Sequence, residues 1–445
     1  MATQLSLVFF MGLLGLVWMR GYKSFPVLAR QFLCIAPFLP VVSVLDHNLD
    51  HDSSSSAAKV APIYVALLLL FLCLLIWRAR GATIRIGGAE VFLAMYILFS
   101  AAQIPASADP VWSLCAWSWS VPGYLLFLMA GRATSETQIA ADRLPAWTML
   151  GFCAISVGFI AIGVIQGRAA TIFYTRNFGS IYASTALLAF LALFIGPAWV
   201  AIRRSAMWSF IIFLVSAMGM LFSISRTAAS VVPVYLLVLS AGSRKQLRRA
   251  TLAVAMVVVS LGLGVWYAGE QLHVDAVFFG DWVSRFENFT VARDSREAKF
   301  SGFRESMFRD VPWHGQGMGT FLHYSNYGDA HNILVTEGFE NSAVAALFLL
   351  LAFSPLKCIR ALFDRELRPF AASILGFLFI GHTTGAMLSY RSEGYYYSAF
   401  PGWTLFYLIG YVLGRLRERS QTCIEGVPGW EASVALANPS SASAS

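Results

Sequence analysis

Two arginines lie beside long apolar stretches of the sequence, where a charged side chain is hard to accommodate. Arg176 precedes the apolar run that starts near residue 181, and Arg226 lies in a Ser-Arg-Thr break between two apolar runs. A charge at the centre of a membrane helix costs on the order of 3 kcal/mol, so each needs water or an anionic partner. Guanidinium binds phosphate oxygens bidentately and stays protonated, which makes both arginines candidate phosphate ligands. The alternative for Arg226 is a short hairpin at the level of the lipid headgroups.

His331 and Asn332 begin the return into the membrane after a long polar connection, in the segment DAHNILVTEGFENS. Histidine accepts a proton near neutral pH, and the asparagine amide could orient a hydroxyl. Glu337 and Glu340 in the same segment are alternative bases. His382 lies inside a later apolar run and is a rival base, although an interhelical hydrogen bond also explains a histidine there. A structural hydrogen bond is the corresponding alternative for His331.

A glycine-rich turn and a polar-aromatic loop complete the candidate set. Gly315–Gly319 (GQGMG) follows no predicted strand, so it does not indicate nucleotide binding, and we expect a sharp turn there. Arg391 lies among tyrosines in a loop suited to sugars. The sequence has no Walker loop, dinucleotide fingerprint, zinc-protease motif or Gly-x-Ser-x-Gly elbow. Its six cysteines form no C-x-x-C pair and are expected to be packing residues.

The composition defines the kind of element that must position these residues. Of the 445 residues, 58% are hydrophobic and 13% are charged, whereas soluble domains have about 45–50% apolar and about 25% charged residues. This excludes a typical cytosolic enzyme, and the 14% aromatic content excludes a disordered chain. The net charge of +8 does not indicate nucleic-acid binding, because the basic residues form short clusters between apolar runs. The composition predicts an all-α polytopic membrane protein.

A helix needs about 20 residues to cross the hydrocarbon core, and thirteen apolar runs are close to this length. They lie at 3–19, 25–45, 60–77, 90–105, 111–130, 146–165, 181–202, 206–224, 227–241, 250–268, 341–356, 370–388 and 399–414. The second run carries Arg30 and three prolines, and the eighth and ninth are short neighbours. We therefore expect 12 or 13 transmembrane helices.

Basic residues predict the orientation of these helices. Every second connection between the runs lies on the same side of the membrane. The connections on one side, together with the segment after residue 414, hold 20 of the 32 lysines and arginines, whereas the short loops on the opposite side hold five. Because short cytoplasmic loops are enriched in basic residues, the first set is expected to be cytoplasmic. This places the N-terminus outside and the C-terminus inside. The apolar N-terminus has no basic n-region and is expected to be a retained helix rather than a cleaved signal peptide.

One exterior connection is much longer than the others. Residues 269–332 carry charges and aromatic residues, and Ser295–Arg309 has the pattern of an amphipathic helix. Connections of this length are usually functional or disordered, and this one is too aromatic to be disordered. The expected division is therefore transmembrane helices in 1–268, a periplasmic loop in 269–332, further transmembrane helices in 333–419, and a disordered cytoplasmic tail in 420–445.

Four segments in this order resemble the O-antigen ligase and O-antigen polymerase superfamily of bacterial envelope polysaccharide assembly. They are Arg176 in TRNFGSIYAS, the Ser225–Thr227 break, Arg296 with the following FSGFRESMFRDVPWHGQGMGTF, and DAHNILVTEGFENS. The segments lie within residues 170–360, which is less than half of the chain. The Pro-Asn expected after the first segment is absent, and Ser342 replaces a glycine in the last. Glu340 falls at the glutamate position of that last motif.

The resemblance implies a metal-independent glycosyltransferase similar to the C-type fold, with no cofactor. Such enzymes transfer a glycan from undecaprenyl diphosphate to an acceptor hydroxyl on the periplasmic side of the inner membrane. His331 would be the general base, and Arg176, Arg226 and Arg296 would bind the diphosphate. The supporting residues would be Asn332, Glu340 and Arg391.

The resemblance leaves the acceptor open. Ligases transfer a chain to lipid A-core, whereas polymerases extend a lipid-linked glycan, and both share these motifs. We favour the ligase type slightly. A secondary transporter or glycolipid flippase is the alternative from another class, although we find no internal repeat of the kind that transporters often have.

Overall fold

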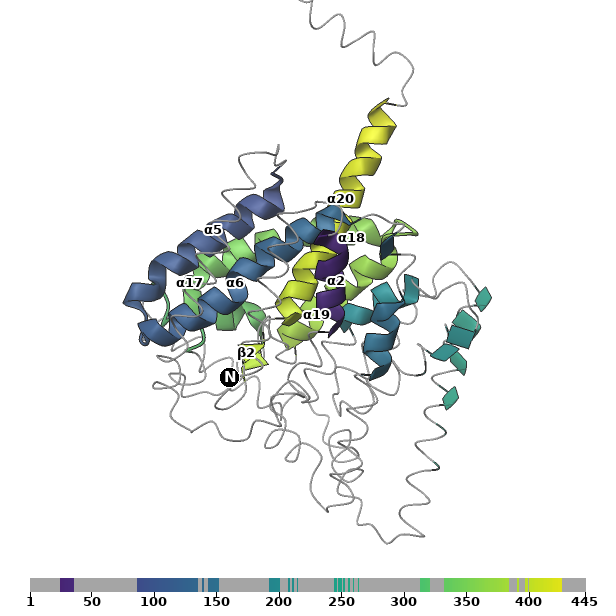
Figure 1. Ribbon diagram of the computed structural model, residues 1–445, viewed down its shortest axis with the longest axis horizontal. Helices are drawn as coiled ribbons and strands as arrows, with labels where there is room; N and C mark the ends of the chain where they lie inside the picture. Colours follow the sequence, from purple (N-terminus) through teal and green to yellow (C-terminus); the bar gives the residue numbers. More distant parts are fainter. Residues whose placement is uncertain are drawn as a thin grey trace, which may run out of the picture.

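A computed structural model of the chain (Figure 1) is mostly helical. It describes residues 25–35, 86–134, 138–139, 143–151, 192–200, 313–320, 332–383, 390–391, 397–398 and 400–425, with isolated helical positions between 207 and 263. The statements below refer to these residues.

The described helices and strands follow one another in the order shown in Figure 1. The helices are α2 (Phe25–Ile35), α5 (Gly88–Gln103), the 3-10 turn η2 (Ile104–Ala106), α6 (Pro110–Ala133), α17 (Ile333–Ala352), α18 (Pro355–Leu362), α19 (Arg368–Thr383) and α20 (Phe400–Glu425). Two-residue strands β1 (Tyr390–Arg391) and β2 (Tyr397–Ser398) pair antiparallel, with Tyr390 opposite Ser398.

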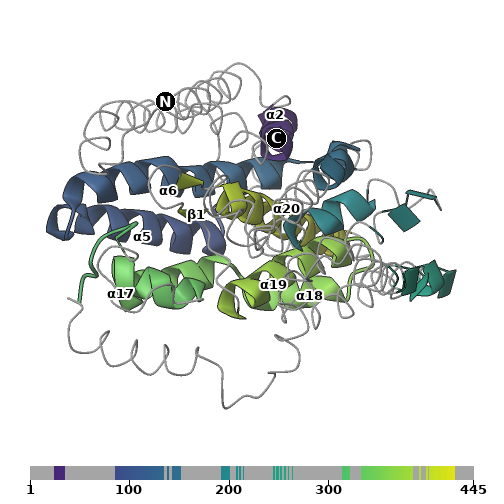
Figure 2. The same cartoon turned by 90° about the horizontal axis from the view of Figure 1, so that it is seen from below.

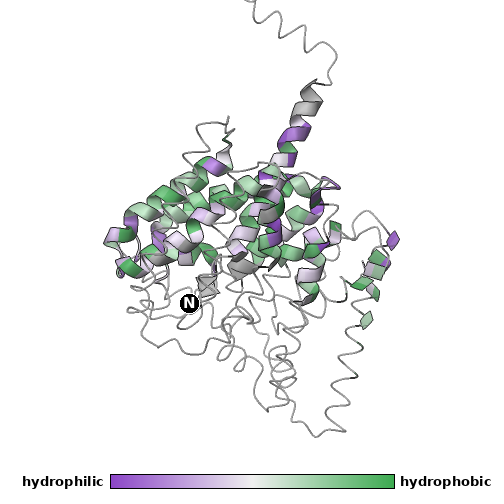
Figure 3. Ribbon diagram, viewed as in Figure 1, coloured by the Kyte–Doolittle hydropathy of each residue, from purple (hydrophilic) through white to green (hydrophobic). Residues whose placement is uncertain are grey.

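Three helical stretches are long and apolar enough to cross a membrane: Gly88–Ala106, Pro110–Ala133 and Ile333–Leu362. Their apolar character is visible in Figure 3. The first two agree with the expected runs 90–105 and 111–130 within a few residues. The all-α membrane class is therefore supported at this level, since helices able to span a bilayer are present.

The expected run 341–356 begins too late. Helix α17 starts at Ile333, because the side chain of Asn332 accepts a hydrogen bond from the amide of Val335 (3.1 Å) and caps the helix. Polar residues in its first turns interrupt the hydropathy signal. Helix α20 is also longer than expected, since it continues to Glu425 and crosses the predicted boundary at residue 420. Figure 1 shows its C-terminal turns projecting away from the other helices.

Helices α6 and α20 pack in parallel through glycines. A Cβ atom at Gly131 would lie 2.0 Å from the carbonyl oxygen of Tyr407, and one at Gly410 would lie 2.0 Å from that of Leu128. The backbones therefore approach as closely as in the small-residue interfaces of membrane helices. Around this contact Trp403 is buried, and its indole nitrogen donates to the carbonyl of Ser120 (2.9 Å).

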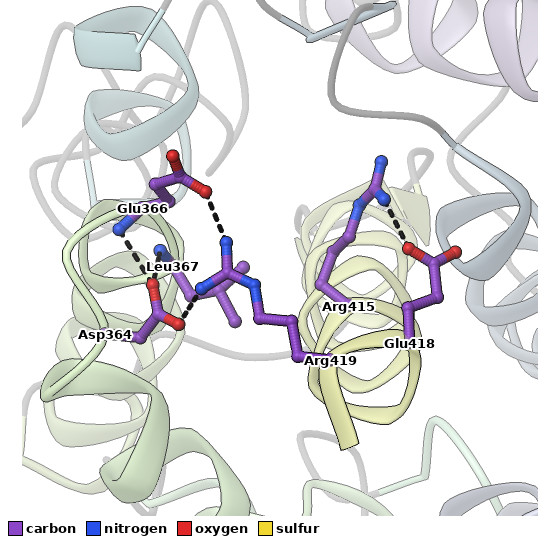
Figure 4. Close-up of polar contacts among 6 residues, drawn as sticks. All are labelled: Asp364, Glu366, Leu367, Arg415, Glu418 and Arg419. Carbon is purple, nitrogen blue, oxygen red and sulfur yellow. Dashed lines mark hydrogen bonds and ion pairs between the residues drawn. The ribbon is translucent and has the colours of Figure 1, made fainter. Parts of the chain in front are cut away.

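Ion pairs connect several helices at one end of the bundle, where basic residues are concentrated. Arg132 at the end of α6 pairs with Glu90 at the start of α5 (2.5 Å). Arg419 of α20 pairs with Asp364 and Glu366 in the turn between α18 and α19 (Figure 4). The described ends of α6, α18 and α20 thus meet at one basic end of the bundle.

Asp364 is held in its charged form by these contacts. Partial burial alone would raise its pKa. The amides of Glu366 (2.9 Å) and Leu367 (3.2 Å) and the guanidinium of Arg419 outweigh burial, so the pKa of Asp364 lies below its ordinary value.

Candidate functional site

Helix α17 is broken in its middle. Ser342 has φ of 78° and ψ of 159°, so the helix consists of two segments that meet at this residue. A positive φ is uncommon for a residue with a Cβ and is maintained only where the surroundings enforce it. Figures 1 and 2 show α17 beside α5, and both segments of α17 contact α5: Glu337 touches Tyr96, and the ring of Phe348 lies 6.2 Å from that of Phe99.

The glycine-rich turn docks on the break. The amides of Gln316 and Gly317 donate to the carbonyls of Phe339 (2.9 Å) and Glu340 (2.8 Å). These carbonyls lie in the last turn of the first segment, where the break removes intrahelical donors. Gly315, Gly317 and Gly319 have positive φ, and a Cβ at Gly315 would lie 2.5 Å from the carbonyl oxygen of Glu340. The turn expected at GQGMG is therefore present, and it caps a helix end.

The same turn contacts the connection between α5 and α6. The amide of Ala108 donates to the carbonyl of Gln316 (2.8 Å), and the indole of Trp112 donates to the carbonyl of Gly319 (3.0 Å). The side-chain amide of Gln103, in the orientation that satisfies its oxygen and nitrogen, donates to the carbonyls of His314 and Asn341. The turn thus joins α5, α6 and α17.

Glu337 lies next to the break and is only 5% exposed. Its Oε2 atom accepts hydrogen bonds from the hydroxyl of Tyr96 (2.8 Å) and the side-chain amide of Asn341 (2.9 Å). Both partners are neutral donors. A buried carboxyl group is costly unless it is hydrogen-bonded, and both contacts offset this cost. The contact with Tyr96 also holds the first segment of α17 against α5, whereas the contact with Asn341 lies within that segment.

The surroundings of Glu337 are unusually polar for a bundle of apolar helices. At the break itself, Glu340, Asn341 and Ser342 are buried. The other buried polar side chains come from neighbouring elements and from the start of α17: Gln103, Ser107, Ser113, Thr320 and Thr336. Among the described residues, the oxygen atoms of the Ser113 and Thr336 side chains and Nδ1 of His314 are buried without a hydrogen-bond partner. Such groups are rare in folded proteins. We define this set, together with Glu337, as the polar cluster.

The structure locates some of the predicted site residues. Asn332 caps α17, and Glu340 is buried in the polar cluster. Arg391 lies in β1 opposite Tyr397, and only its backbone is described. His382 lies in α19, and its side chain is outside the described part. Four predicted residues lie outside the described residues: Arg176, Arg226, Arg296 and His331.

Helix α5 supplies Gln103 to the cluster and Tyr96 as a partner of Glu337, and neither was predicted, although the sequence carried a signal. Tyr96, Ser100 and Gln103 follow one another at i, i+4 and i+7 in an otherwise apolar helix, which places them on one face. Such a polar stripe in an apolar segment indicates a buried polar partner. In the structure Tyr96 and Gln103 contact Glu337 and Asn341 of α17, whereas the hydroxyl of Ser100 accepts a hydrogen bond from the indole of Trp117 in α6.

No group of three or more histidine, cysteine, aspartate or glutamate side chains able to hold a metal ion occurs within the described ranges. The polar cluster offers hydroxyl, amide and carboxyl groups, which can bind sugar hydroxyls or water. The chain matches no family model, and searches of curated proteins and of solved structures find no match.

Proposed function

We propose that this chain transfers a glycan from an undecaprenyl-diphosphate-linked donor to an acceptor hydroxyl at the periplasmic side of the inner membrane. The observation that carries this proposal is the docking of the glycine turn 315–319 on the segment 332–342. These are parts of two of the four segments that resemble the O-antigen ligase and polymerase superfamily. They are joined at a buried polar cluster among helices apolar enough to span a membrane.

The reaction would form one glycosidic bond and break another. The acceptor hydroxyl oxygen attacks the anomeric carbon of the donor sugar, and the bond from that carbon to the diphosphate oxygen breaks. Undecaprenyl diphosphate leaves with the bonding electrons, and Arg176, Arg226 and Arg296 neutralise the developing charge. His331 takes the proton of the hydroxyl, a contribution of roughly 10²–10⁴ in rate.

In this proposal the polar cluster positions the catalytic histidine. His331 directly precedes Asn332, the N-cap of α17. The hydrogen bonds of Glu337 to Tyr96 and Asn341 fix the first segment of α17, and with it the cap. The buried hydroxyls of Ser113 and Thr336 would bind sugar hydroxyls. The acceptor is proposed to be lipid A-core, as for a ligase, with extension of a lipid-linked chain as the polymerase variant.

A second candidate function, transport or flipping of a glycolipid, is favoured by one observation. Transporters often place substrate sites at breaks in membrane helices, and α17 is broken at Ser342 beside two buried carboxyl groups. A transporter would carry its substrate across the bilayer without forming a glycosidic bond. The two functions are therefore separated by the product.

Purified full-length protein in detergent, mixed with lipid-linked donor and lipid A-core, tests the proposal. We expect a ligated glycan on a gel, the same yield with excess chelator, and a loss of roughly 10²–10⁴ in rate for His331→Ala. His382→Ala is the matched control, and it should lower folded yield more than activity per folded molecule.

A null strain gives the complementary result. Unligated lipid-linked chains would support a ligase, and single-repeat caps would support a polymerase. No product from folded protein, combined with an unchanged surface polysaccharide, would refute the proposal.

A further inference from the structure

Helix α18 has an exposed apolar stripe at the basic end of the bundle. Leu356, Ile359 and Phe363 are 80%, 45% and 82% exposed. Their spacing of i, i+3 and i+7 puts them on one face of the helix. The opposite face is packed, since Cys358 and Ala361 are fully buried. One side of α18 is therefore core and the other side is open.

Three basic side chains surround the apolar stripe. Lys357 and Arg360 are exposed on α18, and Arg365 is exposed in the following turn. None of the three forms an ion pair or hydrogen bond with the described residues. Their charges are therefore available to an anionic partner.

The neighbouring acidic groups do not neutralise these charges. Asp364 and Glu366 both pair with Arg419 of α20, as Figure 4 shows. Arg368, by contrast, has a structural role, since its Nε donates to the carbonyl of Leu362 at the end of α18 (2.8 Å). The surface formed by the stripe and the three free basic residues thus has a net positive charge.

Contacts at both ends place α18 along α20. Phe353, just before α18, lies with its ring 5.8 Å from that of Phe406, and Asp364, just after α18, pairs with Arg419. Helix α18 therefore runs from the packed part of the bundle to its basic end. Its open side combines apolar and basic groups, the combination that suits the boundary between acyl chains and headgroups in a bilayer.

We propose that this surface binds anionic phospholipids. The phosphates would be bound by Lys357, Arg360 and Arg365, and the acyl chains would lie on the apolar stripe. Long basic side chains extend from apolar surfaces to headgroups, and each contributes to attraction by an anionic leaflet. A second copy packed through the same face would bring six like charges together, which is unfavourable. The inference does not depend on the proposed glycan transfer.

The test counts bound lipids by native mass spectrometry on full-length protein purified in a neutral detergent. The protein is titrated with dioleoyl phosphatidylglycerol or, separately, with dioleoyl phosphatidylcholine. We expect preferential binding of phosphatidylglycerol. The triple variant Lys357→Gln, Arg360→Gln, Arg365→Gln should lower its apparent affinity by at least about fivefold, the contribution of one basic residue, and by about 10²-fold if the three contributions add. Binding of phosphatidylcholine should not change.

A matched control removes the same charge elsewhere. Arg244, Lys245 and Arg248 are exposed on another helical segment, and changing all three to glutamine should leave the affinity for phosphatidylglycerol within about twofold. If the triple variant folds poorly, Arg360→Gln alone replaces it, and this single variant should lose part of the affinity. Unchanged binding in the folded triple variant, or an equal loss in the control, would refute the proposal that this surface binds anionic phospholipids. A change of oligomeric state without a change in lipid binding would indicate a second copy instead.

Discussion

Glu337 connects the first segment of α17 to α5, because it accepts a hydrogen bond from the hydroxyl of Tyr96. Tyr96→Phe removes one donor and leaves the carboxylate oxygen with Asn341 alone. A hydrogen bond to a charged or buried group contributes about 1–3 kcal/mol, so we expect destabilisation of this size in thermal unfolding of the purified protein. Glu337→Leu, which removes the acceptor oxygens, and the double variant complete the cycle. If the effects of the two single changes simply add, the hydroxyl and carboxyl do not interact.

Gly315 provides a second test at the level of single residues. An alanine there would have to adopt φ of 84° with its Cβ 2.5 Å from the carbonyl oxygen of Glu340. The strain of such a backbone costs about 1–3 kcal/mol, and displacement of the turn should also lower the proposed transfer activity. Gly88→Ala is the control, because the nearest atom to its Cβ, on Phe92, is 4.0 Å away and Gly88 is helical. It should retain wild-type stability and activity, and equal losses in both would argue against the docking geometry.

Among the elements, the contact between α6 and α20 depends on glycine. Gly410→Ala places a Cβ 2.0 Å from the carbonyl oxygen of Leu128, whereas Gly414→Ala places one 3.2 Å from that of Arg132. The first change must separate the backbones, so we expect a loss of about 1–3 kcal/mol or more, and the second should cost much less. Thermal unfolding of both variants checks this order. The reverse order would show that the helices do not pack in this register.

Some of these elements were predictable from sequence and others were not. The runs 90–105 and 111–130 identify α5 and α6, because continuous apolar length is what a bilayer requires. The start of α17 was missed because Glu337 and Glu340 lower the local hydropathy, although both residues belong to the helix. The break at Ser342 could not be predicted, since its positive φ accompanies tertiary hydrogen bonds from the glycine turn rather than a local preference.

For the candidate site, the sequence indicated some residues of the polar cluster and could not indicate others. Asn332 and Glu340 were named from a motif, and both lie in the helix that carries the polar cluster. Tyr96 and Gln103 are about 240 residues away in sequence from their partners in α17. Only folding brings these residues together. A polar stripe on one face of α5 indicates that a partner exists, but it does not identify the partner.

For the whole molecule, the ion pairs at the basic end predict a dependence of stability on pH. The pKa of Asp364 is lower in the folded protein than its ordinary value of 3.8. Its stabilising contribution is therefore fully present above that ordinary value and is lost as the pH falls through the lower folded pKa. Thermal unfolding midpoints of wild type and Asp364→Asn should differ by a constant amount near neutral pH and converge in strong acid. A difference that grows on acidification would contradict the predicted sign.

The orientation of the whole chain is predicted from its basic residues. A reporter fused after Arg249 should be active in the cytoplasm, because that connection carries four basic residues. A reporter near Asn288, in the long connection, should be active in the periplasm. Identical compartments for both fusions would show that the helices between them are wrongly assigned.

The parallel packing of α6 and α20 also has a consequence for the number of membrane crossings. Gly123 lies against Trp403, the carbonyl of Leu128 against Gly410, and that of Arg132 against Gly414, so the two helices run in the same direction. If both cross the bilayer, the chain between them must cross an odd number of times to begin α20 on the side where α6 began. Seven apolar runs lie between them, which satisfies this parity. Merging 206–224 with 227–241 would leave six and reverse α20, so the parallel pair predicts an odd number of crossings between α6 and α20.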